Sequence, residues 1–160
     1  MLRHLKITLI CTIALWGFVG SLHNVTDWNG TLGAVTATTS MATFEGGGDS
    51  WRATSQPVII WLGALFIMLS KFTAAVLCAV GGIKMWQAKH LSSDEFNQSK
   101  ELALAGVAVA VIMLFGGFIV IAEGWYELWR SEVMREPVLQ TAFRYAGIIT
   151  LIGIFVANND

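Results

Sequence analysis

The sequence predicts an all-α polytopic membrane protein, an antiparallel bundle of four transmembrane helices with a long loop between helices one and two. Of the 160 residues, 55% are hydrophobic and 13% are charged, and the mean hydropathy is +0.63. Soluble domains carry about 25% charged residues, so this composition is typical of a chain embedded in lipid. A spanning helix needs about 20 apolar residues. Four stretches qualify: 5–22, 58–83, 102–122 and 143–157. They leave no room for a soluble domain, so residues 1–160 are predicted to form a single membrane domain.

The first span begins with the stretch MLRHLKITLICTIALWGFVGS. Its basic start, apolar middle and small residues Gly20 and Ser21 also fit a cleaved signal peptide. We prefer a retained helix, and the cleaved alternative stays open. Cys11 and Cys78 both fall inside predicted spans without a disulfide or metal-binding spacing, so we interpret them as packing residues.

Loop one, residues 23–56, is rich in Gly, Thr and Ser and contains the run Gly46 to Gly48. We expect most of it to be irregular, although the stretch TLGAVTATTSMATF is apolar enough to lie along the membrane surface. Asn24-Val25-Thr26 matches the glycosylation pattern, which arises often by chance.

The later helix starts are marked by Pro57 and by Ser92 with Glu95, a capping-box pattern. Span three is therefore predicted to begin near Ser93, before the membrane, and to run to about Arg130. The orientation of the chain in the membrane is predicted from the basic residues that flank the spans on each side. Five basic residues, Arg3, Lys6, Lys84, Lys89 and Lys100, lie on the side of the chain ends, against four, Arg52, Arg130, Arg135 and Arg144, on the other. This narrow excess predicts that the N- and C-termini are cytoplasmic.

Small residues repeat at helical spacing in three spans. In lipid such stripes mark where helix backbones approach closely. The stripes are Ala64, Lys71, Ala75, Cys78 and Gly82 in span two, Ala103, Gly106, Ala110, Gly117 and Gly124 in span three, and Ala146, Thr150, Gly153 and Ala157 in span four. We interpret them as the packing faces of the bundle, with Lys71 among the interface residues.

A second, polar face on the predicted third helix comprises Gly116, Glu123, Glu127 and Arg130. It lies almost opposite the small-residue stripe. Two interpretations stay open: the face is solvated just above the membrane, or it contacts another protein.

Lys71 is the most unusual residue of the spans. If Trp61 and Trp86 mark the two interfaces, Lys71 is close to the bilayer centre, where a charge costs about 2.5 to 3.5 kcal/mol. Glu123 lies roughly 15 Å from that depth, so no carboxylate of this chain is expected to pair with the lysine. The alternatives are a neutral amine, a hydrogen bond to a hydroxyl such as that of Thr12 or Thr150, a buried water, or a carboxylate of a neighbouring subunit.

The sequence offers little chemistry. His4, His23 and His90 lie at or beyond span ends and do not face one another, so a haem or quinone-reducing core is not expected. We find no catalytic set, metal cluster or phosphate-binding loop, and no basic run that would bind nucleic acid. We therefore expect no enzyme activity and no catalytic, cofactor-binding or metal-binding residues. No small-molecule substrate is evident from the sequence.

Three blocks carry a family resemblance: LRHLKITLICTIALWGFVGSLHNVTDW, SMATFEGGGDSWRATSQP, and FGGFIVIAEGWYELWRSE followed by TAFRYAGIITLIGIFV. They resemble a bacterial family known only as predicted small integral membrane proteins, a domain of unknown function. The resemblance covers essentially the whole chain and implies four helices in the bacterial inner membrane. It supplies no activity and no catalytic residues.

Three functions are compatible with these observations. The preferred hypothesis is a structural or accessory subunit that binds a larger inner-membrane complex through its helix faces and loop one, with lipid and other membrane subunits as partners. The alternative is a small oligomeric transporter or channel with Lys71 in the pathway, since intramembrane charges are functional candidates. A third is an envelope sensor whose loop one binds a ligand or partner protein.

Overall fold

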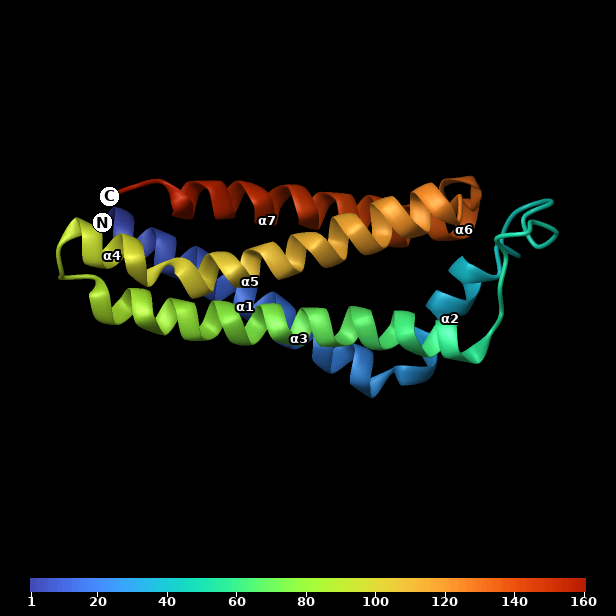
Figure 1. Cartoon of the computed structure of the whole chain (residues 1–160), viewed down its shortest axis with the longest axis horizontal. Helices are drawn as coiled ribbons and strands as arrows, with labels where there is room; N and C mark the ends of the chain where they lie inside the picture. Colours follow the sequence, from blue (N-terminus) through green and yellow to red (C-terminus); the bar gives the residue numbers. More distant parts are fainter.

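The protein is a bundle of four long helices that run alternately in opposite directions (Figure 1), seen in a computed structural model that describes residues 1–160. Each helix is long and apolar enough to cross a membrane: Leu2–Thr26, Pro57–Ala88, Ser93–Trp125 and Glu132–Ala157. The predicted all-helical membrane fold is confirmed. Both chain ends lie at one end of the bundle, which we call the terminal end, and the segment 40–56 lies at the opposite, loop end (Figure 1).

The first long helix, α1 (Leu2–Thr26), is followed almost directly by a second helix, α2 (Trp28–Thr39). The expectation that most of loop one is irregular is therefore wrong for residues 28–39. Asp27 causes the break: its backbone leaves the helical region, and its carboxylate caps α2 by accepting a hydrogen bond from the Gly30 N–H at 3.0 Å. The irregular part of loop one is confined to residues 40–56.

Helix α3 (Pro57–Ala88) is the longest element, and proline occupies its first turn. With 32 residues it measures about 48 Å, which exceeds the roughly 30 Å hydrocarbon core of a bilayer. Its loop end carries Trp61, whose ring lies 5.2 Å from that of Trp28, so α2 is anchored beside the start of α3.

The third long helix is built in three parts, α4 (Ser93–Ser99), α5 (Glu101–Val111) and the π-helical segment η1 (Ile112–Trp125). The predicted capping box before α4 is present: the Ser92 hydroxyl accepts from the Glu95 N–H, and the Glu95 carboxylate accepts from the Ser92 N–H at 3.1 Å. The expected continuation to Arg130 is wrong. Glu127 adopts a left-handed conformation (φ 52°, ψ 33°) that follows the end of η1, so Glu123 and Arg130 do not share a helix face.

The last long helix returns the chain to the terminal end. It consists of α6 (Glu132–Met134), the π-helical η3 (Arg135–Gln140) and α7 (Thr141–Ala157), and a short turn η2 (Leu128–Arg130) joins it to η1. On α7, Gly153 faces α5, where an added Cβ would lie 2.7 Å from the Val107 side chain. Small residues therefore let α7 lie closely against the third helix.

Helices α1 and α3 meet backbone against backbone. A Cβ added to Gly17 of α1 would lie 2.7 Å from the Lys71 carbonyl oxygen and 2.9 Å from the Ala75 Cβ. One added to Gly82 of α3 would lie 3.3 Å from the Cys11 sulfur. These distances leave no room for larger side chains, as expected for helix packing in lipid.

The adjacent face of α3 packs on α5 just as closely. A Cβ on Gly81 would overlap the backbone of Ala103, and one on Gly106 would lie 2.8 Å from the Cys78 backbone nitrogen and 2.9 Å from the Ala74 carbonyl oxygen. Helix α3 thus packs on α1 and on α5 through two rows of small residues, which together we call the α3 seam.

A buried polar cluster joins the chain ends to the bundle at the terminal end. Lys6 and Lys100 are only 1% and 2% exposed, and their amines donate to the Asn158 carbonyl oxygen at 2.6 and 2.8 Å. Lys6 also donates to the Asp160 carboxylate at 2.7 Å, and Arg3 lies 3.5 Å from that carboxylate. Because buried cations need nearby acceptors, this cluster fixes α1, α5 and the end of α7 to one another.

The α3 seam makes a direct prediction about packing. Gly81→Ala places a methyl group against the Ala103 backbone, so we expect it to lower the free energy of unfolding by about 1 to 3 kcal/mol, the usual cost of overpacking. The matched control is Gly147→Ala in α7, where nothing lies within 4 Å of the added Cβ. Unfolding by SDS in mixed micelles measures both variants. Equal stabilities would contradict the close packing of α3 on α5.

Candidate functional site

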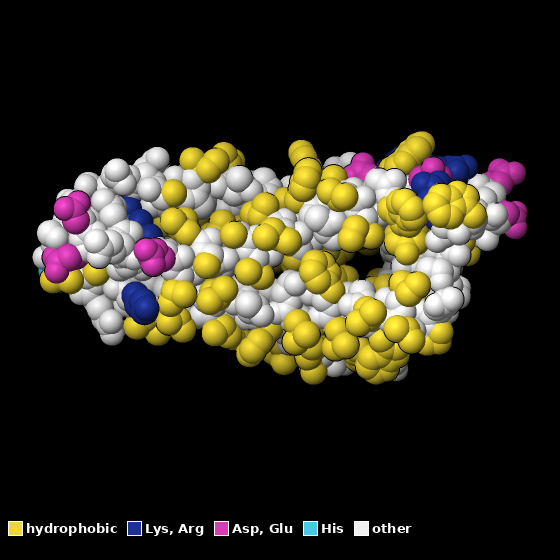
Figure 2. Space-filling view, in the orientation of Figure 1, with side chains coloured by type: hydrophobic (Ala, Val, Ile, Leu, Met, Phe, Trp, Pro, Cys, Tyr) yellow, Lys and Arg dark blue, Asp and Glu magenta, His cyan; other side chains and the backbone are white.

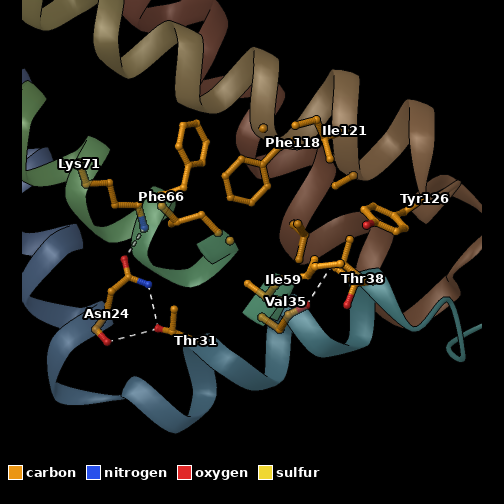
Figure 3. Close-up of a pocket in the computed structure, with 17 residues that line it drawn as sticks. Asn24, Thr31, Val35, Thr38, Ile59, Phe66, Lys71, Phe118, Ile121 and Tyr126 are labelled. Atoms are coloured by element: carbon orange, nitrogen blue, oxygen red, sulfur yellow. Dashed lines mark hydrogen bonds between the residues drawn. The ribbon is translucent and has the colours of Figure 1, made fainter. Parts of the chain in front are cut away.

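Lys71 lies near the middle of α3 and points toward the end of α1. Its Nζ donates a hydrogen bond to the Asn24 side-chain oxygen at 2.8 Å. Its methylene stem lies beside Gly20, where an added Cβ would come within 3.2 Å of the Lys71 Cδ. The lysine therefore projects into a helix interface, with its charged end at the junction of α1, α2 and α3 (Figure 3).

Asn24 is itself held by the first turn of α2. Its amide nitrogen donates to the Thr31 hydroxyl at 2.9 Å, and that hydroxyl donates to the Asp27 carbonyl oxygen at 3.1 Å. Asn24 and Thr31 are each 8% exposed. Because they are buried, each of their polar atoms needs a partner within the protein. The break at Asp27 folds α2 back far enough to place Thr31 beside Asn24.

The Lys71 amine uses only one of its N–H donors in a hydrogen bond within the protein. An ammonium carries three N–H bonds, and Asn24 accepts one. None of the five ion pairs of the chain involves Lys71. The remaining donors lie at the edge of a cavity that Lys71 helps to line.

This cavity has a volume of about 380 Å³ and lies between α2, α3, η1 and the start of the last long helix. Figure 2 shows the surface hollowed between α3 and η1, toward the loop end. The middle of the cavity is apolar, with the rings of Phe66 and Phe118 between Lys71 and the far end (Figure 3). Pockets of about 300 to 1,000 Å³ with a few placed polar groups are the usual binding sites for small molecules.

The far end of the cavity is polar again. Thr39 and Tyr126 both line it. The Tyr126 ring lies at the end of the cavity away from Lys71 (Figure 3), and its hydroxyl is a second place where a bound molecule would find a polar contact. The Thr39 hydroxyl is buried within the protein and has no hydrogen-bond partner.

The cavity is closed on the other side of Lys71. There the α3 seam begins, with Gly17 of α1 against Lys71 and Ala75. Lys71 therefore lies where the cavity meets the seam.

The other predicted interface residues of span two all lie in the seam. Ala75 and Gly82 face α1, whereas Cys78 faces α5, where its sulfur lies 3.6 Å from the Ala103 carbonyl oxygen. On η1, Gly116 has open space around it, and Glu123 is partly exposed and belongs to none of the ion pairs.

Glu127 and Arg130 hold loop one of their own chain. The Glu127 carboxylate accepts from Arg52 at 2.7 Å and from Arg130 at 3.0 Å, and Arg130 donates to the Glu45 carbonyl oxygen at 3.2 Å. The hydrogen bonds from Arg52 and then Arg130 keep the pKa of Glu127 below its ordinary value. Since a lowered carboxyl pKa favours the charged form, this clamp weakens only as the pH falls below the range where free glutamate protonates, near 4.3.

The partner of Lys71 was not among the predicted alternatives. Thr12, one candidate, instead donates to the Leu9 carbonyl oxygen at 2.7 Å. Asn24 lies outside the predicted span 5–22, where the sequence marks it only as part of a glycosylation pattern. The signal that identifies it is its spacing: Gly17, Gly20 and Asn24 lie three and four residues apart on one face of α1, and both glycines approach Lys71.

Comparison with known proteins places the whole chain in one family. Residues 2–159 match the family described as "Predicted small integral membrane protein (DUF2165)". The chain belongs to this family, as the resemblance in its sequence indicates. No curated protein matches the chain. No solved structure matches it.

The hydrogen bond between Lys71 and Asn24 can be tested by a double-mutant cycle. Asn24→Leu leaves the Lys71 amine without an acceptor, so we expect the free energy of unfolding to fall by about 1 to 3 kcal/mol. In a Lys71→Met background the same substitution should cost much less, because no donor is stranded. SDS unfolding of the four proteins measures the coupling. Equal costs in both backgrounds would show that the two side chains do not interact.

Proposed function

We propose that the protein is a non-enzymatic binding protein of the membrane that holds a small molecule in the cavity beside Lys71. One observation carries the proposal: the amine of Lys71, which has only the Asn24 oxygen as a partner, faces a cavity of about 380 Å³. The cost of a charge at this depth makes such a residue a functional candidate. The cavity lining contains an amine, an amide and hydroxyls but no histidine and no carboxylate, which supports binding and not catalysis.

Binding is favoured over conduction by the shape of the site. A transporter or channel with Lys71 in its pathway needs a continuous route past the lysine. Between α1 and α3 the seam closes that route, because Gly17 lies directly against the backbone of Lys71 and against Ala75. A conducting form would have to separate α1 from α3 along this line of contacts.

An accessory role in a larger membrane complex is a second proposal, supported by the loop end. Residues 40–56 are pinned there by Glu127, and the indole rings of Trp51 and Trp125 stack edge to face at 5.5 Å. Trp51 is 83% exposed and Trp129 is 53% exposed. Tryptophan is enriched among the residues that dominate protein interfaces, so we propose that other membrane subunits bind here.

For the location we propose the bacterial inner membrane with both termini cytoplasmic. The chain ends share one end of the bundle (Figure 1), together with Arg3, Lys6 and Lys100. The excess of basic residues at this end supports the orientation through the positive-inside rule.

Purification from bacterial membranes in a mild detergent, followed by native mass spectrometry, tests the binding proposal. We expect the protein to carry a noncovalent adduct. Gly117→Leu should abolish it, because Gly117 lines the cavity and a leucine there would fill the space beside Phe66. Gly147→Leu, with nothing near the added side chain, is the matched control and should keep the adduct.

Two outcomes would contradict the proposals. A wild-type protein without any adduct, or an adduct that survives Gly117→Leu, would remove the cavity as a binding site.

The same preparation tests the accessory role. If the protein is an accessory subunit, we expect a stoichiometric membrane partner to copurify with it. A homo-oligomer alone that conducts ions in liposomes would instead favour a transporter or channel.

A further inference from the structure

The Lys71 cavity is polar at both ends and apolar between them. At the inner end is the Lys71 amine, with Asn24 as its neutral partner. At the outer end is the hydroxyl of Tyr126 (Figure 3). Between the ends, Phe66 and Phe118 form an apolar wall (Figure 3). A molecule that fills this space must match this order of polar and apolar groups.

The inner end selects for a negative charge. The Lys71 ammonium has unpaired donors and no carboxylate within ion-pairing distance in this chain. An anion placed against it would make charge-assisted hydrogen bonds in surroundings of low dielectric, where they are strongest. A neutral ligand would leave the cation with a single amide oxygen.

The number of donors selects for a carboxylate over a phosphate. Lys71 is the only cationic side chain in the cavity lining. The Asn24 amide nitrogen is already bonded to Thr31. A phosphate group presents more acceptor oxygens and more charge than one amine satisfies, and phosphate sites in proteins usually add arginines or a helix N-terminus. A carboxylate has two oxygens and one charge, which suits the available donors.

The outer end selects for a second polar group. Tyr126 lines this end of the cavity, and its side chain is only partly buried (Figure 3). Along α3 the cavity lining runs from Ile59 to Lys71, about 18 Å at 1.5 Å per residue. An elongated molecule can therefore place its charge at Lys71 and a hydrogen-bonding group near Tyr126.

From this geometry we propose that the ligand is an amphipathic monocarboxylate, with its carboxylate on Lys71, its apolar body against Phe66 and Phe118, and a hydroxyl or carbonyl group at its other end near Tyr126. This inference rests on the proposed function and names the chemical class that the site takes. The carboxylate lies deep in the membrane and the opposite end lies toward the loop end of the bundle.

The test uses the full-length protein in lipid nanodiscs and a decanoic acid that carries a photoreactive diazirine in mid-chain. After illumination, mass spectrometry should find the label on the peptides that contain Phe66 and Phe118. Unlabelled decanoate should prevent labelling at a concentration about tenfold lower than decanol does, because only decanoate pairs with Lys71. 10-Hydroxydecanoate should compete better still, by about two- to tenfold, because it adds one hydrogen bond.

The variants separate the two ends of the site. Lys71→Met should remove the advantage of decanoate over decanol. Tyr126→Phe, which removes only the hydroxyl, should keep that advantage and remove the preference for 10-hydroxydecanoate. Lys84→Met, which changes an exposed lysine of the same helix, is the control and should keep both.

The outcomes distinguish this inference from the proposed function. If decanol competes as well as decanoate on the wild type, or if Lys71→Met keeps the carboxylate preference, the ligand class is wrong, while an adduct in the pocket would leave the binding function standing. If the pocket carries neither the adduct nor the label, the binding function itself fails.

Discussion

The close approach of α3 to both α1 and α5 is the constraint on which the rest of the structure depends. In lipid, apolar surface alone does not drive helices together, so association relies on tight packing and hydrogen bonds. Gly17, Gly81 and Gly106 provide that packing, since a side chain at any of them would overlap the neighbouring backbone. The seam runs through the terminal half of the bundle and stops at Lys71. Beyond it, the phenylalanines Phe66 and Phe118 line a cavity instead of a contact.

The position of Lys71 at this boundary explains how the chain accommodates a cation inside the membrane. On the closed side its backbone is part of the seam, and on the open side its amine meets Asn24 and the cavity. The break between α1 and α2 belongs to the same arrangement. Non-helical backbone at membrane depth is tolerated where it is buried in protein or lines a cavity. Asp27 forms the break beside Asn24 and Thr31, which line this one.

The spans could be predicted because apolar length and helical periodicity are local properties. The capping box of Ser92 and Glu95 is equally local, and it is present. The hydrogen-bond partner of Lys71 could not be predicted from the sequence. Helix α1 continues past residue 22, and the break at Asp27 determines which groups surround Asn24. The position of Glu127 could not be predicted either. Its own left-handed conformation breaks the helical periodicity from which a face shared with Glu123 is predicted. Long-range contacts with Arg52 then determine its role.

The central claim is that the Lys71 amine is held by Asn24 at the inner end of an intramembrane cavity. Magic-angle-spinning NMR on ¹⁵N- and ¹³C-labelled protein in lipid bilayers tests it most directly, through a through-space correlation between the Lys71 Nζ and the Asn24 side-chain carbonyl carbon. The structure predicts this cross-peak, at a separation consistent with the 2.8 Å hydrogen bond, and its loss in Asn24→Leu. A Lys71 Nζ that correlates with lipid phosphates and not with Asn24 would contradict the account.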